Sequence, residues 1–191
     1  MSVIELMVGI AIVAMLFAFA APGFGTWIQN TQIRTASEVI QNGLMLARGE
    51  AVRLNSTVRF QLTSSLTSSC VLSPSGTDWV VSQDDPSGAC DSAASDTTAP
   101  RIIQVRSGTE GSKNASVAAG QSVVVFNGLG RVTPVPAGNI AIDITNPIGG
   151  GCATDAPVGP MRCLRVVVSP NGQVLMCDPK FASSDPQGCP P

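Results

Sequence analysis

The sequence contains neither histidine nor tyrosine, and charged residues make up only 13% of its 191 residues. Histidine is the commonest general base and a frequent metal ligand, so its absence excludes most hydrolase and metalloenzyme chemistries. Serines are frequent, but without a histidine or an SxxK motif none of them has an evident activating base. The formal net charge of −2 is too close to zero to favour a nucleic-acid partner on bulk electrostatics. We therefore expect a protein that is not an enzyme and uses no metal or other cofactor.

Cysteine is present, but never in the closely spaced CxxC pairs that zinc sites usually need. An even number of widely spaced cysteines favours disulfides and an oxidising compartment such as the periplasm over reduced thiols in the cytosol. Six cysteines can pair in many ways, and the simplest expectation joins sequence neighbours. Those pairs are Cys70–Cys90, Cys152–Cys163 and Cys177–Cys189. We expect them to stabilise long loops and to have no redox role.

The N-terminal segment Leu6–Phe24 lacks any charged or strongly polar side chain. As a helix, it falls within the roughly 17–25 residues that span the hydrocarbon core of a bilayer. A cleaved signal peptide fits less well, because no Lys or Arg occurs before Arg34. A buried core helix also fits less well, since a helix that is apolar all round is unusual in a small soluble domain. Glu5 directly precedes the run, and a carboxylate at that depth needs a partner. Alternatively, Glu5 lies at the lipid headgroups as an acid at the start of the helix, where the helix dipole favours it.

After this run the pattern changes, and apolar or small residues recur in steps of three and four. They form one helical face made of Ile33, Ala36, Val39, Ile40, Gly43, Leu44, Ala47, Ala51 and Leu54. We expect one continuous helix of about fifty residues that ends near Asn55. Pro22, which lacks a backbone donor, should kink or loosen this helix near its middle.

Beyond the helix, short apolar stretches typical of strands alternate with runs rich in Ser, Gly, Pro, Asp and Thr. The candidate strands are Val58–Leu62, Trp79–Ser82, Ile102–Arg106, Val123–Asn127, Ile140–Ile144, Leu164–Ser169 and Gln173–Cys177. Ser169-Pro170-Asn171-Gly172 should form the turn between the last two strands, and Gly128-Leu129-Gly130 is also interpreted as a turn. The predicted fold is α+β: a long helix whose amphipathic half packs on an antiparallel, β-sandwich-like head with disulfides.

The segment SVIELMVGIAIVAML resembles the N-terminus of type IV pilin-like proteins. In that family a peptidase-processed chain begins with a methylated hydrophobic residue and carries a glutamate four residues later. Met1 and Glu5 stand in this relation, and Pro22 falls where such pilins commonly have a proline. The usual first residue is Phe and here is Met1, with no leader ending in Gly before it; either the sequence was trimmed to the mature chain or its start was assigned downstream.

Distal motifs place the resemblance in the GspH/FimT group. They are ARGEAVRLNSTV (Ala47–Val58), the Trp79 strand, FNGLGRV (Phe126–Val132) and RCLRVVVSPNGQVLMCDP (Arg162–Pro179). The resemblance implies that residues 1–28 are a transmembrane and polymerisation helix, 29–55 its amphipathic second half, and 56–191 a periplasmic β-rich head. It also implies a single-pass inner-membrane protein that later enters a pilus or pseudopilus. Its partners would be major and other minor pilins or pseudopilins, the prepilin peptidase and the inner-membrane assembly platform.

Three roles are consistent with this group. We expect a minor type IV pilin of the pilus tip, with an H-type pseudopilin of a type II secretion system as the alternative. A second alternative is a DNA-binding FimT-type subunit, which carries a basic GRxR-like segment near its C-terminus. The matching stretch here, Gly172–Leu175, has neither arginine, and only Arg162, Arg165 and Lys180 lie nearby as possible DNA contacts. Three cations neutralise few phosphates, so DNA binding is less favoured than assembly at the pilus tip.

Overall fold

The long N-terminal helix is the first element of the structure. The computed structural model describes residues 2–108 and 110–191, except for the side chains of residues 17–22. Helix α1 spans Val3–Leu54 and ends at Asn55, whose left-handed conformation (φ 46°, ψ 41°) lets its N–H donate to Ala51 and Val52 carbonyls. The prediction of one helix ending near Asn55 is confirmed. The side chain of Pro22 is outside the described residues, so its effect on the helix stays a prediction.

The first sheet follows the helix directly and is antiparallel, in the order β3-β2-β1-β5. Its strands are β1 (Val58–Thr63), β2 (Asp78–Ser82), β3 (Ile102–Arg106) and β5 (Val123–Phe126). Because side chains alternate along a strand, Phe60 and Leu62 of β1 reach the main core while Gln61 faces the other way. Gln61 is buried too, because its cross-strand neighbour Val80 packs on that outer face with the Cys70–Cys90 disulfide.

The second sheet is also antiparallel, in the order β4-β6-β7-β8. Its strands are β4 (Ser116–Ala119), β6 (Ile140–Thr145), β7 (Leu164–Val168) and β8 (Val174–Cys177), and the 3-10 helix η1 (Pro147–Gly149) follows β6. The β7–β8 turn closes as predicted, with the Gly172 N–H donating to the Ser169 carbonyl at 2.8 Å. Strand β4 was not predicted, because Val117 is its only large apolar residue and sequence alternation is therefore weak.

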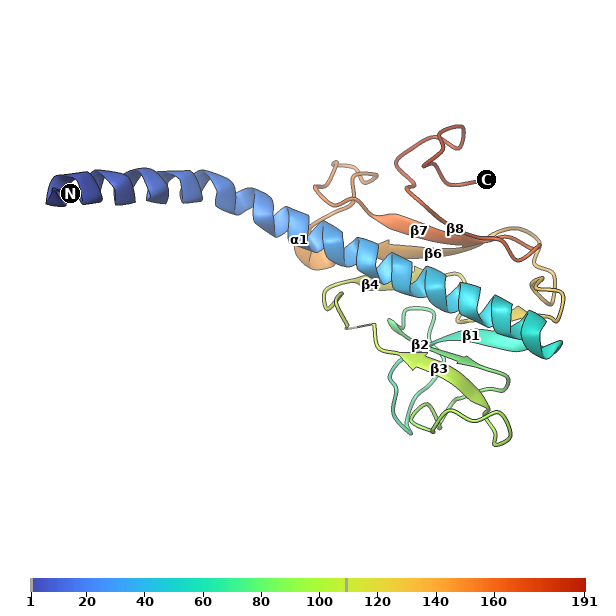
Figure 1. Ribbon diagram of the computed structural model, residues 1–191. Coiled ribbons are helices and arrows are strands. Elements are labelled where there is room, and N and C mark those ends of the chain that lie inside the picture. The colour runs from blue at the N-terminus through green and yellow to red at the C-terminus, as the bar shows by residue number, and fades with distance from the viewer. Residues whose placement is uncertain (1, 109) are drawn as a thin grey trace.

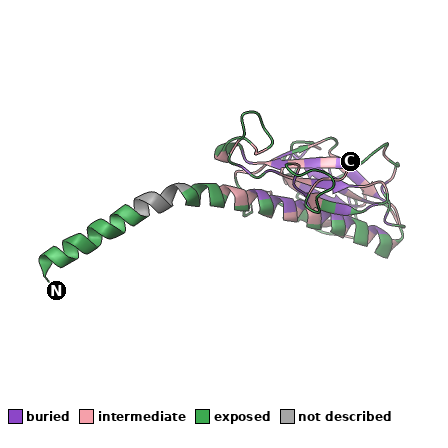
Figure 2. Ribbon diagram, turned by 90° about the horizontal axis from the view of Figure 1, so that it is seen from above, coloured by how far each residue is buried: buried purple, intermediate pink, exposed green. Residues whose placement is uncertain are grey.

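Helix α1 packs on both sheets (Figure 1). The sequence predicted that it contacts the head, without distinguishing the two sheets. Its buried face, formed by Ile33, Ala36, Ile40, Leu44, Ala47 and Ala51, shares one core with inward residues of both sheets. The helix comes closest at Gly43, where an added Cβ would lie 2.8 Å from the Phe60 ring and 3.0 Å from the Trp79 ring. The N-terminal half extends away from this core, as the burial colours of Figure 2 show.

Three disulfides close loops of the head, and their neighbour-to-neighbour pairing is as predicted. Cys70–Cys90 covers the outer face of the first sheet. Cys152–Cys163 ties the loop after η1 to the start of β7. Cys177–Cys189 holds the C-terminal tail against the end of β8. The last two bonds therefore restrain segments that have little regular structure of their own, whereas Cys70–Cys90 joins the segments before and after β2.

Candidate functional site

The described side chains of the N-terminal half of α1 form an apolar surface that no other described part of the chain covers (Figures 1 and 2). All described side chains from Ser2 to Ile28 are exposed, and the exposed fraction of the large apolar ones runs from 77% at Val3 to 46% at Ile28. They lie on every side of the helix, so one flat neighbouring surface could not cover them. Contiguous apolar exposure on this scale marks a surface that another molecule covers.

Glu5 lies exposed at the start of this projecting half. One carboxylate oxygen accepts a hydrogen bond from the Ser2 N–H at 3.2 Å, so within a single chain Glu5 caps its own helix. Met1, whose amine is the predicted partner in a filament, lies outside the described residues. The role of Glu5 in assembly therefore stays a prediction.

The membrane span predicted for Leu6–Phe24 includes residues 17–22, whose side chains are not described. Where side chains are described, no helix is both long enough and apolar enough to cross a membrane.

A cluster of amides holds the head to α1 where the projecting half begins. We call Gln29, Asn30, Gln32, Asn114 and Asn146 the amide collar. The Asn146 side chain is fully buried and donates to the Gln29 side-chain oxygen at 2.6 Å. The same oxygen accepts from the Asn114 side chain at 3.2 Å, while Gln32 accepts from the Asn114 N–H at 2.9 Å. The collar thus fixes two loops, one before β4 and one after β6, to a single helical turn.

The sequence interpretation missed this collar. The cluster of amides directly after the apolar run was the available signal, but its partners Asn114 and Asn146 lie far along the chain. Asn30 completes it by accepting a hydrogen bond from the Arg162 N–H at 2.7 Å.

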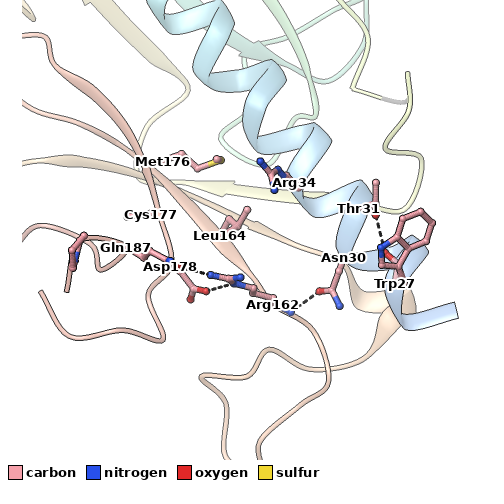
Figure 3. A pocket seen from close by; sticks show the side chains of 11 residues that line it. Trp27, Asn30, Thr31, Arg34, Arg162, Leu164, Met176, Cys177, Asp178 and Gln187 are labelled. Carbon is pink, nitrogen blue, oxygen red and sulfur yellow. Dashed lines mark hydrogen bonds and ion pairs between the residues drawn. The ribbon is translucent and has the colours of Figure 1, made fainter. Parts of the chain in front are cut away.

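An open cavity of about 650 Å³ lies beside the collar, between α1 and the end of the second sheet (Figure 3). Trp27 and Arg34 line it from the helix, and Arg162, Asp178 and Gln187 line it from the C-terminal side. The Arg162 guanidinium donates to Asp178 at 2.6 Å and to Gln187 at 2.7 Å. Asp178, the one carboxylate among the described lining residues, is 97% buried by this contact and its surroundings, since its side chain is only 3% exposed. Arg34, the other cation of the lining, pairs with Glu38 further along α1. Each charged group of the lining is therefore paired, and the cavity is suited to contacts rather than to acid–base chemistry.

The three cations named as possible DNA contacts do not form one free basic patch. Arg162 is paired with Asp178, and its guanidinium also lies 5.6 Å from the centre of the Phe181 ring. Arg165 pairs at 2.6 Å with Asp143, its cross-strand neighbour on β6. Lys180 is exposed, and its backbone N–H donates to Asp178. Two of the three charges are thus already balanced by carboxylates. Among the described residues, no group of three or more Cys, Asp or Glu side chains is arranged to hold a metal ion.

Comparison with known proteins identifies the family of this chain. A family model described as Type II transport protein GspH matches residues 36–172, which is more than half of the chain. The chain belongs to the GspH family. The fold resembles the type IV minor pilin FimU of Pseudomonas aeruginosa (strain PAO1) in space group P21, with a TM-score of 0.51 and 14% identity over 82% of this chain and 94% of that one. The same pilin in space group P65 gives a TM-score of 0.49 and 15% identity over 82% and 98%. No curated protein matches the sequence significantly.

The GspH-family match begins inside the second half of α1 and ends in the β7–β8 turn. It therefore covers the buried helical face except Ile33, most of both sheets and the disulfides Cys70–Cys90 and Cys152–Cys163. The projecting half with Glu5, and the tail closed by Cys177–Cys189, lie outside it. The likeness to FimU, at this identity, supports the fold: a long helix packed on antiparallel sheets.

Proposed function

We propose that this GspH-family protein is a minor type IV pilin, a non-enzymatic subunit carried at or near the pilus tip. Residues 6–24 anchor it in the bacterial inner membrane, with the head in the periplasm, until it is moved into a filament. The observation that supports this most directly is the projecting half of α1, whose described apolar side chains are exposed on all sides. Lipid covers such a surface before assembly, and the helices of major and other minor pilins cover it afterwards.

Processing and assembly follow from the N-terminal motif. The prepilin peptidase leaves residue 1 as the methylated N-terminus, and the inner-membrane platform moves the subunit into the filament. Inside a bundle of staggered helices, Glu5 would lose water and need a new partner in place of the Ser2 N–H that it accepts from now. The amine of residue 1, its own or that of a neighbouring subunit, has the required charge. An unpaired carboxylate in a low-dielectric core is heavily penalised, so this pairing favours the correct register.

A second candidate function is that of an H-type pseudopilin in a type II secretion system. The family description, Type II transport protein GspH, favours it. Both roles use the same helix and differ in the filament that receives the subunit.

Deletion of the gene distinguishes the two roles. For a minor pilin, we expect the loss or a strong reduction of surface pili, restored by the wild-type chain, while secretion of exoproteins continues. Loss of secretion with normal piliation would assign the protein to the secretion system instead. Fractionation of the same cells tests the anchor: the chain should stay with membranes until detergent is added, and a chain released by lysis alone would contradict it.

A further inference from the structure

The head carries a second exposed apolar surface next to the point where α1 leaves it. We call residues 147–159, which comprise η1 and the following loop, the foot. Figure 1 shows this segment, in light orange, at the margin of the head that faces the projecting half of the helix. Ile148 is 72% exposed and Val158 75% exposed. The helix α1 contacts η1, and on its preceding turns Phe24 and Trp27 are similarly exposed, so exposed apolar side chains occur on both elements at this end of the head.

We propose that the foot rests in the lipid headgroup layer and holds the head against the membrane before assembly. This inference rests on the proposed membrane anchor. Its occupant is the lipid surface itself, because the foot is contiguous with the segment proposed to enter the bilayer.

The foot is fixed relative to the helix and is not a free loop. Asn146, directly before η1, donates to both the side-chain oxygen and the backbone carbonyl of Gln29. At its other end the loop reaches buried Met161, and the Cys152–Cys163 disulfide closes it. The position of residue 29 relative to the membrane surface therefore also sets the position of the foot.

The level of the foot matches the headgroup layer. If Phe24 ends the hydrocarbon span, Gln29 lies about 7.5 Å further along the helix axis, at 1.5 Å per residue. The headgroup region on one side of a bilayer is roughly 5–7 Å thick. Because Gln29 contacts Asn146, η1 lies at the outer edge of that layer, where Ile148 and Val158 can enter it.

The two sides of this end of the head differ in polarity. The foot contains one charged residue, Asp155, whose carboxylate accepts from the Cys152 N–H at 2.6 Å within its own loop. The loop held by Asn114 carries Glu110 and Lys113. A bilayer therefore favours the side of the foot, and the helix should tilt toward it.

The attraction is apolar and not electrostatic. The nearest arginines, Arg34 and Arg162, are paired with Glu38 and Asp178. Paired guanidiniums add little attraction to anionic lipid, so contact of the foot with the bilayer should depend little on lipid charge or on salt.

Tryptophan quenching in vesicles tests this with the full-length chain. Trp27→Phe leaves Trp79, which is 3% exposed, as a constant buried reference in every variant. A second substitution then adds one reporter: Ile148→Trp in the foot, Leu129→Trp at the opposite end of the head, or Ile10→Trp in the proposed span. Leu129 is a matched control because it is 78% exposed and lies in the turn whose Gly130 carbonyl accepts from Arg48 near the end of α1. Each variant is placed in phosphatidylcholine vesicles whose acyl chains carry bromine near the headgroup.

We expect Ile148→Trp to be quenched to an extent closer to Ile10→Trp than to Leu129→Trp, equally with and without added anionic lipid. If Ile10→Trp is quenched while Ile148→Trp behaves like Leu129→Trp, the proposed contact of the foot with lipid is wrong and the membrane anchor stands. If no reporter is quenched, the anchor fails and the foot fails with it. Quenching of Ile148→Trp only with anionic lipid would overturn the apolar basis of the contact.

Discussion

At the scale of single residues, the amide of Gln29 carries an unusual share of the contacts between helix and head. Its side-chain oxygen accepts from Asn114 and from the fully buried Asn146. Gln29→Ala removes this partner from the buried Asn146 amide and leaves it the 3.3 Å hydrogen bond to the backbone carbonyl of residue 29. We expect the free energy of unfolding to fall by about 1–3 kcal/mol, the usual cost when a buried polar group loses a hydrogen-bond partner. Chemical denaturation of the full chain in detergent measures this.

The control for Gln29→Ala is Gln121→Ala. Gln121 is exposed, and the one described hydrogen bond of its side chain goes to the nearby Val123 carbonyl, so its removal should change stability by less than about 0.5 kcal/mol. Equal effects of the two substitutions would contradict the special position of Gln29.

A second residue-scale prediction concerns the stability of the fold at acidic pH. Arg101 donates two hydrogen bonds to Asp84, at 2.6 and 2.7 Å, and this holds the pKa of the Asp84 carboxyl below its usual range. The Ser87 hydroxyl and N–H lower the pKa of Asp85 in the same way. In the unfolded chain both carboxyls bind protons more readily. Stability present above pH ~4, the ordinary pKa of aspartate, should therefore be lost as the pH falls toward the depressed folded values.

The measurement is the urea midpoint of unfolding between neutral and acidic pH. Asp84→Asn should make the midpoint less dependent on pH, and Arg101→Gln should do so to a similar extent because it removes the other half of the pair. The effect is modest, since each side chain is more than a third exposed and solvent screens the pair. An unchanged pH dependence in both variants would show that the pair contributes nothing.

At the scale of elements, α1 approaches the first sheet most closely at Gly43. Alanine favours a helix over glycine by up to about 1 kcal/mol, but at this position its Cβ would meet the Phe60 and Trp79 rings. Overpacking typically costs about 1–3 kcal/mol, so Gly43→Ala should destabilise the protein on balance. Gly49→Ala, in the same helix but with nothing within 4 Å of the added Cβ, should stabilise it. Thermal unfolding of the two variants side by side gives the test, and shifts of the same sign would contradict the close packing.

The elements differ in how far the sequence predicted them. The ends of α1 and of the predicted strands lie within one residue or two of the structure, because alternation and turn residues are local signals. Strand β4 was missed because alanines give no alternation. The amide collar was missed because hydrogen bonds between residues about 80 or more positions apart leave no local pattern. The sequence also left Arg162 and Arg165 as free cations, because their partners Asp178 and Asp143 lie 16 and 22 positions away and only the folding of the sheet brings them together.

At the scale of the whole molecule, the ion pairs of Arg162 and Arg165 reduce the positive charge that is available to bind DNA. Affinity for duplex DNA grows with the number of phosphates that unpaired cations neutralise. We expect the full chain to bind duplex DNA weakly or not at all near physiological salt. Replacing Arg162, Arg165 and Lys180 by Gln should therefore change binding little, as an electrophoretic or fluorescence titration over a range of salt would show. Micromolar or tighter binding that the three replacements abolish would favour the DNA-uptake role instead.

The whole molecule also combines a stable head with a helix half that is incomplete without other molecules. Glu5 lies at the far end of that half, where the only described hydrogen bond of its carboxylate comes from the Ser2 N–H. Its proposed pairing in the filament should matter for assembly and not for folding or membrane insertion. Glu38, a carboxylate further along the same helix and paired with Arg34 at the head surface, provides the matched control.

The most direct measurement compares the amount of this protein in sheared pili for the wild type, Glu5→Gln and Glu38→Gln at equal membrane levels. We expect Glu5→Gln to reduce incorporation severalfold, because the neutral amide cannot form the charge pair with the amine of residue 1. Glu38→Gln should be incorporated like the wild type, since an exposed surface pair contributes little. Equal incorporation of Glu5→Gln and the wild type would contradict the proposed mechanism and leave Glu5 as a helix cap.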